Sequence, residues 1–392
     1  SVVLVATDHR RAEVRAATVF YAVMTQLGFV VILLAMMMLV SAADADRFSD
    51  IGAIPDPVRN VVFLLTFAGF GSKAGLLPLH AWLPRAHPEA PSPVSALMSA
   101  AMVNMGVYGV IRVDLQLLGP GPRWWGLTLL TVGAVTAIYG VLQAAVATDL
   151  KRLLAYSTVE NMGLVTLALG AAALLTTAGV GAAALLAVTA ALLHLVAHAA
   201  FKSLGFLGAG SVLTATGQRN LDQLGGLAHR MPATALLFGI GAFGATGLPL
   251  GAGFVSEWLL VQSLIHARAD GDTLVGLAMP LAVGTVALTA GLGVAAMVKA
   301  FGLSFLARAR SEAAARAGEA PATMLAGMAA VAVCCVVLGV APFLLTPTLQ
   351  AVVRTLPAFG DADLSSLGPV LRLPGLAGSM PPGLLAVALA AA

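Results

Sequence analysis

Long stretches with few or no charged residues make up most of this sequence. A helix needs about 20 apolar residues to cross a hydrocarbon core ~30 Å thick. Ten such stretches follow one another, at residues 16–43, 60–84, 90–111, 124–148, 153–176, 182–213, 232–265, 273–307, 320–353 and 373–392. The alternating pattern of a membrane β-barrel is absent. We therefore expect an all-α integral membrane protein, a polytopic helical bundle with about ten spans.

The composition excludes several other classes of protein. Of the 392 residues, 59% are apolar and 10% are charged, whereas about a quarter of residues are charged in soluble globular proteins. The net charge of +3 does not indicate a nucleic-acid partner, because the basic residues are scattered among apolar stretches. Cys334 and Cys335 are too few for a disulfide framework, a four-cysteine zinc site or an iron–sulfur cluster. We expect no cofactor in this chain, and any redox chemistry to belong to a partner protein.

Basic residues in the predicted connections indicate the orientation of the chain. If the spans alternate in direction, seven lysines and arginines lie on one side of the membrane. Eleven lie on the other, which we expect to be cytoplasmic: Arg10, Arg11, Arg15, Arg85, Lys151, Arg152, Arg219, Arg230, Arg308, Arg310 and Arg316. This pattern predicts a multi-pass protein of a prokaryotic plasma membrane. The first residues, SVVLVATDHRR, look like the end of a span followed by a cytoplasmic loop, so we expect natural N-terminal helices to precede them.

Several ionisable residues remain inside the predicted spans once the loops are assigned. A charged group facing lipid costs a few kcal/mol, so each should face the bundle interior, a water-filled cavity or a partner. We consider all of them candidates for ion translocation: Lys73, His80, Glu160, His194, His198, Lys202, Glu257 and Lys299.

The clearest cluster is HLVAHAAFK, which places His194, His198 and Lys202 at positions i, i+4 and i+8. On a helix these side chains form a polar stripe ~12 Å long, which is nearly half of the hydrocarbon core. Histidine titrates near neutral pH, so the stripe can pass protons between neighbours. Alternatively, the histidines are structural and bond one another, backbone carbonyls or water. A metal site is less favoured, because the glutamate of H-E-x-x-H is missing.

Two predicted spans are interrupted by proline or glycine beside a buried charge. Pro78 follows Lys73 and cannot continue the backbone hydrogen-bond ladder. Gly247 and Pro249 interrupt the seventh span just before Glu257. Discontinuous helices in corresponding positions are typical of transporters built from repeats. Because the second and seventh spans are five helices apart, the repeats would be inverted; ordinary proline kinks are the alternative.

Two further residues have ambiguous positions. Glu160, in YSTVENMG, lies ~12 Å inside the predicted cytoplasmic boundary, where it fits either an interhelical hydrogen bond or a role in proton uptake. Lys299 lies nine residues before Arg308, so its side chain can either extend to the membrane surface or join the relay.

The sequence matches no motif for catalysis or nucleotide binding. FAGFGSKAG is glycine-rich but fits neither the phosphate-binding loop nor a strand–turn–helix dinucleotide site. No Ser-His-Asp or Cys-His arrangement is placed to face an aqueous pocket. We therefore expect no catalytic centre in this chain.

With these features in place, the chain resembles the antiporter-like membrane subunits of respiratory complex I, Mrp-type Na+/H+ antiporters and membrane-bound hydrogenases. The resemblance extends from about residue 10 to 310 and rests on GSKAGLLPLHAWLPRAHPEAPSPVSALMS, DLKRLLAYSTVENMG, HLVAHAAFKSLGFLGAGSV and GLPLGAGFVSEW. Within the family, YSTVENMG and YAVMTQLG are most similar to the large membrane subunit of hydrogenase-4 and formate hydrogenlyase complexes.

The resemblance implies inverted five-helix repeats and a chain of protonatable residues along the membrane mid-plane. Residues 1–118 would be the C-terminal part of the first repeat, 119–310 the second repeat, and 311–392 additional transmembrane helices. Lys73 would be the lysine of the first broken helix, His194, His198 and Lys202 the central connection, and Glu257 the carboxylate of the second broken helix. The family's glutamate partner for the Lys73 position would lie on a helix that precedes residue 1.

Three positions depart from the family pattern. Asn104, in MVNMGVYG, replaces a common lysine, Ala197 replaces a common asparagine, and LGAG at 250–253 replaces a Pro-Leu-Asn-Gly type of turn. An asparagine side chain can hold a bridging water but cannot store a proton. Asn104 therefore removes a titratable link between Lys73 and the central histidines.

These observations lead to three hypotheses. The first is a proton- or Na+-translocating subunit of a membrane complex, coupled to redox chemistry in partner subunits. The expected partners are further antiporter-like subunits, a quinone- or hydrogenase-linked membrane subunit and a peripheral redox arm. The second is a scaffold that seats such an arm and moves no ions, which Asn104 motivates. The third is a subunit of a stand-alone cation/proton antiporter.

Overall fold

The computed structural model describes residues 2–45, 47–269 and 271–391, and helices dominate this part of the chain. The N-terminal half contains α1 (Val2–Val5), α2 (Ala12–Ala43), α3 (Asp56–Ala74), α4 (Leu83–Glu89), α5 (Ser92–Leu97), α6 (Val103–Gly109), α7 (Arg123–Val146) and α8 (Leu150–Thr177). The C-terminal half contains α9 (Gly181–Thr216), α10 (Leu227–Arg230), α11 (Pro232–Gly244), α12 (Phe254–Ile265), α13 (Thr273–Phe305), α14 (Glu312–Ala315), α15 (Ala322–Val340), α16 (Thr346–Val353), β1 (Leu371–Arg372), β2 (Ser379–Met380) and α17 (Pro382–Ala391).

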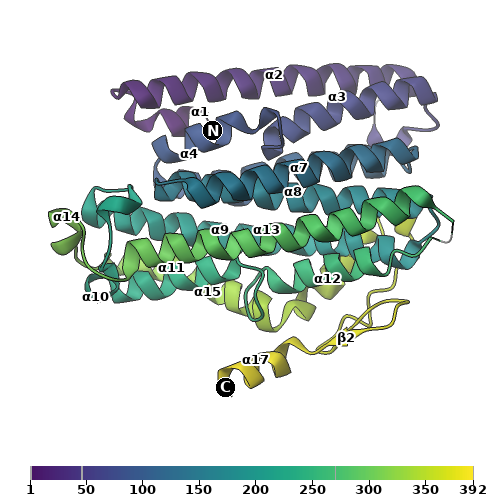
Figure 1. Cartoon of the computed structure of the whole chain (residues 1–392). Coiled ribbons are helices and arrows are strands. Elements are labelled where there is room, and N and C mark those ends of the chain that lie inside the picture. Colours follow the sequence, from purple (N-terminus) through teal and green to yellow (C-terminus); the bar gives the residue numbers. More distant parts are fainter. Residues whose placement is uncertain (1, 46, 270, 392) are drawn as a thin grey trace.

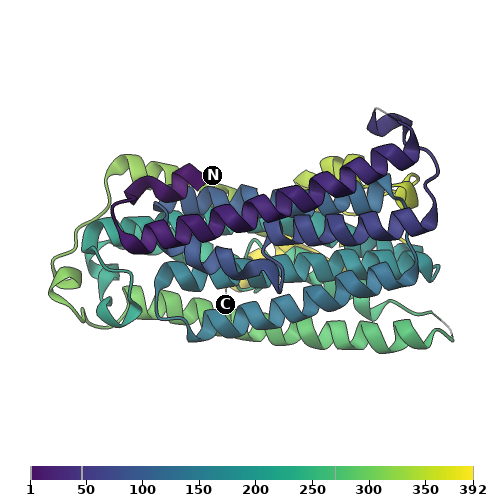
Figure 2. The same cartoon turned by 90° about the horizontal axis from the view of Figure 1, so that it is seen from above.

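The long helices run side by side, as two perpendicular views show (Figures 1 and 2). α2 and α3 form one flank, α7, α8, α9 and α13 follow, and α17 lies on the opposite flank (Figure 1). α8 is the central helix, since 94% of its most apolar stretch is buried, against 11% for α2. The exposed apolar face of α2 is therefore available to lipid or to another membrane protein.

Close packing of α7 against α8 fixes the centre of the bundle. A Cβ atom on Gly133 would lie 2.3 Å from the backbone nitrogen of Leu167, and one on Gly163 would lie 2.4 Å from that of Ala137. Small residues at such crossings let two helix backbones approach closely, which is how membrane helices gain packing contacts without a hydrophobic driving force. The orientation of α8, and of the polar residues it carries, is held by this contact.

Within the described ranges, eight helices are long and apolar enough to cross a membrane, and these confirm the predicted helical membrane bundle. The seventh predicted span is divided into α11 and α12, as its glycine and proline indicate. The ninth predicted span ends early, because α15 stops at Val340 and a short 3-10 turn, Pro342–Leu345, leads into α16.

The tenth predicted span, residues 373–392, requires correction. Its first part is not helical: β1 pairs with β2 in a short antiparallel hairpin. The helix α17 begins only at Pro382 and has 10 described residues, a rise of about 15 Å. The apolar composition of this segment suggested a span, but its prolines and glycines favour a turn over a continuous helix.

Candidate ion-translocation site

The first broken helix is interrupted directly after Lys73. α3 stops at Ala74, Gly75 takes a left-handed conformation with φ of +83°, and Pro78 follows before the next helical turn. Lys73 thus lies in the last turn of α3, where the negative end of the helix dipole stabilises a cation by about 0.3–1 kcal/mol. Its Nζ lies 5.9 Å from the centroid of the Tyr21 ring, and the side chain lines a cavity of about 270 Å³ between α2 and α3.

At the second broken helix the ionisable residue lies at the opposite end of a helix dipole. α11 ends at Gly244, and α12 begins at Phe254 with Glu257 in its first turn, where the positive end of the helix dipole stabilises an anion. Gly247 lies in the break with φ of +62°, and a Cβ atom there would be 2.1 Å from Glu257 Oε2. A glycine is therefore required for the Glu257 carboxylate to lie against the broken backbone.

The polar stripe of α9 faces the interior of the bundle, and all three of its residues are buried. His194 contacts two helices: its Nε2 lies 2.9 Å from Asn161 Oδ1 on α8, and its Nδ1 lies 2.9 Å from Ser256 Oγ on α12. Neither ring nitrogen of His198 has a hydrogen-bond partner among the described residues. Lys202 Nζ lies 3.4 Å from the Leu154 carbonyl oxygen of α8.

Glu160 joins this stripe from α8. It is 4% exposed, and the charges of Lys202 and Glu257 both act on its carboxylate. Gly293 of α13 faces it, since a Cβ atom there would lie 3.0 Å from Glu160 Oε1. Helices α8, α9 and α12 therefore bring together the residues that we call the central row: Glu160, His194, His198, Lys202 and Glu257.

Three candidate residues lie outside the central row. Lys299 of α13 donates hydrogen bonds of 2.8 Å to the carbonyl oxygens of Ala145 and Ala147, so it caps the C-terminal end of α7. His80 packs edge-on against Tyr139 with ring centroids 4.9 Å apart. Lys73 is in the separate cavity beside α2.

Asn104 connects the first part of the bundle to α9. Its Nδ2 donates to the backbone oxygen of Leu195 at 3.2 Å and to that of Ala100 at 2.9 Å. Its Oδ1 is buried without a partner among the described residues. The contact with α9 is adjacent to His194, at the place where the sequence led us to expect the missing titratable link.

Sequence reasoning overlooked His87, which lies at the end of the first broken helix in the segment RAHPEAP. It is fully buried, and its ring stacks on Phe206 of α9 with centroids 4.7 Å apart. The charges of Lys151 and Lys202 both act on the ring. Because His87 lies between Arg85 and Glu89, the sequence suggested that it belongs to a loop. The family motif that contains it, GSKAGLLPLHAWLPRAHPEAPSPVSALMS, is the signal that could have indicated a functional role.

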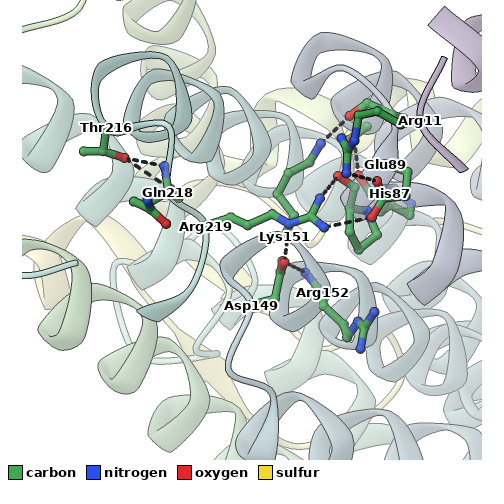
Figure 3. A network of polar contacts seen from close by, with 12 residues as sticks. Arg11, His87, Glu89, Asp149, Lys151, Arg152, Thr216, Gln218 and Arg219 are labelled. Atoms are coloured by element: carbon green, nitrogen blue, oxygen red, sulfur yellow. Dashed lines mark hydrogen bonds and ion pairs between the residues drawn. The ribbon is translucent and has the colours of Figure 1, made fainter. Parts of the chain in front are cut away.

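A network of ion pairs covers His87 on the side of the predicted cytoplasmic loops (Figure 3). Arg219 bridges two carboxylates, at 2.8 Å from Glu89 and 2.7 Å from Asp149. Arg11 pairs with the other oxygen of Glu89 at 3.0 Å. The network joins the loop before α2, the end of α4, the start of α8 and the segment after α9.

The described residues also limit what the site can bind. Among them, no group of three or more histidine, cysteine, aspartate or glutamate side chains is arranged to hold a metal ion. The central row itself supplies an amine, two imidazoles and two carboxyl groups, which can bind protons and form hydrogen bonds.

Comparison with known proteins places the chain in a family. An uncharacterised protein of Mycobacterium tuberculosis is 64% identical over 388 residues, which is 99% of this chain and 61% of that protein. Hydrogenase-4 component B of Escherichia coli is 38% identical over 355 residues, which is 89% of this chain and 53% of that protein. The chain thus spans about three fifths and about half of the length of these two relatives.

A solved structure has the same fold. A chain in the structure of the membrane-bound sulfane sulfur reductase, an archaeal respiratory membrane complex, superposes with a TM-score of 0.77 at 24% identity, covering 96% of this chain and 60% of that chain. Residues 1–281 match the family described as NADH:quinone oxidoreductase/Mrp antiporter, transmembrane. The resemblance seen in the sequence is therefore confirmed: the chain belongs to the antiporter-like membrane subunit family of complex I, Mrp antiporters and hydrogenase-type complexes.

Proposed function

We propose that this chain is a proton- or Na+-translocating subunit of a membrane complex similar to respiratory NADH:quinone oxidoreductase or to membrane-bound hydrogenase. Redox chemistry in a peripheral arm of partner subunits would drive the ion movement, in the plasma membrane of a prokaryote. Ions would move through Lys73 and the central row, with His80 and Lys299 outside the main path.

The observation that carries this proposal is the arrangement around Lys202. Its ammonium group lies within electrostatic reach of Glu160, and His198 lies one turn away on the same helix. A lysine, two histidines and two carboxylates come together from three helices, and each of these groups can bind and release a proton. Placing ionisable side chains inside a membrane bundle costs free energy, so their presence there indicates a function.

Energy considerations support a switch based on small movements. Moving one charge against 100 mV costs ~2.3 kcal/mol. Two unit charges about 6 Å apart interact by roughly 3 kcal/mol at an effective dielectric constant near 20. Moving Lys202 and Glu160 a few ångströms further apart from such a separation would change the free energy of proton binding by roughly 1 kcal/mol, a substantial part of one step of transport.

The proposal is tested in sealed membrane vesicles that contain the full-length protein with its partner subunits. Proton uptake and the redox rate are measured separately for the wild type and for Lys202→Met, which keeps the side-chain volume and removes the amine. We expect proton uptake to be lost while the complex stays assembled. His229→Gln, an exposed histidine on the predicted cytoplasmic side, is the matched control and should transport normally.

A scaffold function is the second candidate, and Asn104 is the observation that favours it. In that case Lys202→Met would leave proton uptake at the wild-type level. A stand-alone cation/proton antiporter is the third candidate. It would show the same dependence on Lys202, but the protein would purify without a redox arm and would transport in response to an ion gradient alone.

A further inference from the structure

A cavity of about 620 Å³ opens on the side of the predicted cytoplasmic loops, where the end of α4, the start of α8 and the segment after α9 meet. Its lining includes Arg11, Glu89, Asp149 and Arg219, the four residues of the ion-pair network (Figure 3). A polar cavity of this size holds many water molecules. Water and protons from the aqueous phase therefore reach the carboxylates of this network.

Lys151 lies directly beneath the cavity. It is fully buried in the first turn of α8, and its Nζ donates to the backbone oxygen of Ala90, a residue of the cavity lining. The charges of Arg219, Asp149 and Glu89 all act on Lys151. The lysine is thus in electrostatic contact with the aqueous cavity on one side and with His87 on the other.

His87 lies against α9 one turn beyond Lys202, since its ring stacks on Phe206, and the charges of both Lys151 and Lys202 act on it. Its ring is packed against Phe206, and neither Nδ1 nor Nε2 has a partner among the described residues. A neutral imidazole always carries one N–H donor, and a buried donor without a partner costs about 1–3 kcal/mol. A histidine serving only to fill space would be replaced at lower cost by an apolar ring of similar size.

We propose that His87 is the proton inlet of the central row, receiving protons from the cavity beside Lys151 and passing them to Lys202. This inference rests on the translocation function proposed above and names one of its uptake routes. The route is independent of Lys73, which matters because Asn104 cannot store a proton at the contact between the first broken helix and α9.

The proton transfer balances without any other reactant. A proton from cavity water binds the free ring nitrogen of His87, and the proton on the other ring nitrogen passes to the neutral amine of Lys202. The ring ends neutral, Lys202 ends as an ammonium ion, and the cavity water has lost one proton. The ring lies between two lysines, so its cationic form is short-lived and transfer requires that Lys202 be deprotonated first.

The test compares His87→Gln with the wild type in vesicles that hold the intact complex. Glutamine fills part of the same space and forms hydrogen bonds but cannot transfer a proton. We expect proton uptake to fall by about a hundredfold or more, which is at the low end of what loss of an acid–base group costs. In His87→Gly, added imidazole should restore uptake, and it should do nothing for Lys202→Met. His229→Gln is again the matched control.

A second measurement covers the possibility that His87 variants fail to assemble. With Cys334 and Cys335 changed to serine, Gln218→Cys places a thiol in the cavity lining, and a charged, membrane-impermeant thiol reagent is added from the predicted cytoplasmic side. Modification should block proton uptake, whereas modification of His229→Cys, outside the cavity, should not.

The outcomes separate this inference from the proposed function. If Lys202→Met transports normally, the translocation function itself is wrong. If Lys202→Met is inactive while the Gln218→Cys vesicles remain active after modification, protons enter elsewhere and only the His87 inlet is wrong. Normal uptake by an assembled His87→Gln complex would also overturn the inlet.

Discussion

His194 and Ser256 form a hydrogen-bonded pair that accommodates two protonation states of the histidine. Asn161 Nδ2 donates to the Ser157 carbonyl oxygen at 2.6 Å, so its Oδ1 is an acceptor and His194 Nε2 carries a proton. Ser256 Oγ lies within hydrogen-bond distance of both His194 Nδ1 and the Gly253 carbonyl oxygen. When the hydroxyl donates to Nδ1 the ring is neutral, and when it donates to Gly253 the ring donates to Ser256 and is a cation.

This pair connects proton binding to the second broken helix. Gly253 and Ser256 both belong to the start of α12, and Glu257 is the next residue. Protonation of His194 therefore changes a hydrogen bond at the break without leaving any group of the pair unsatisfied. The arrangement gives the protonated ring a hydrogen-bond partner and links the arrival of a proton to the start of α12, next to Glu257.

Replacing Ser256 by alanine should impair proton transport, because His194 Nδ1 then has no partner in either protonation state. The expected loss is about tenfold, less than the roughly 10²- to 10⁴-fold that removal of the acid–base group itself costs, because Ser256 acts through His194. Ser263→Ala is the matched control, since Ser263 is buried on the same helix and donates only to the Ala183 carbonyl oxygen. Equal proton uptake by the two variants would contradict the role of the pair.

Gly247→Ala should displace the Glu257 carboxylate. The added Cβ atom would lie 2.1 Å from Glu257 Oε2, and the backbone has a positive φ that alanine adopts only with strain. We expect an assembled complex with strongly reduced proton uptake. Gly276→Ala on α13, where nothing lies within 4 Å of the added atom, should be neutral. Full activity of Gly247→Ala would show that the position of Glu257 is unimportant.

Lys299→Met should lower stability more than transport. The variant removes two hydrogen bonds to the last carbonyl groups of α7, each worth about 1.5–3 kcal/mol when the donor is charged. Thermal unfolding of the purified complex should shift to lower temperature, while proton uptake per assembled complex stays near the wild-type level. A stable Lys299→Met complex that does not transport would instead place Lys299 in the relay.

Glu319, outside the membrane spans, gives a prediction about pH. Partial burial raises the pKa of its carboxyl group, but hydrogen bonds from the Thr234 hydroxyl and the backbone N–H groups of Ala320, Ala233 and Thr234 outweigh it and hold the pKa below the usual 4.5. A carboxylate with a depressed pKa stabilises the fold above its unfolded pKa and loses this contribution as pH falls through its folded pKa. Glu319→Gln should therefore reduce the unfolding temperature at pH 7, and the difference should shrink below pH 4.5. A difference that is independent of pH would exclude this charge effect.

The helices and the two breaks could be predicted from the sequence because their causes are local. Uncharged stretches define the spans, and Pro78 and Gly247 interrupt the backbone wherever the rest of the chain lies. The stripe of His194, His198 and Lys202 follows from helical spacing alone. The inverted repeats and the divisions at residues 118 and 310 stay predictions.

The remaining features depend on how helices are rotated and packed. Whether Glu160 faces Lys202 depends on the close contact of α7 with α8, which no pattern within α8 specifies. His87 lies in a short helix after a break, so span-based reasoning did not consider it. Residues 373–392 are apolar enough for a span, but the turn residues in their first part form a hairpin instead.

The most direct test of ion translocation is the number of protons taken up per electron transferred in a Lys202→Arg complex. Arginine keeps the positive charge and much of the side-chain volume, but it does not release its proton in proteins. If protons pass through Lys202, the Lys202→Arg complex should assemble, transfer electrons and take up fewer protons per electron than the wild type. An unchanged ratio would mean that no proton passes through Lys202, and the central row would then have to be a structural feature of the bundle.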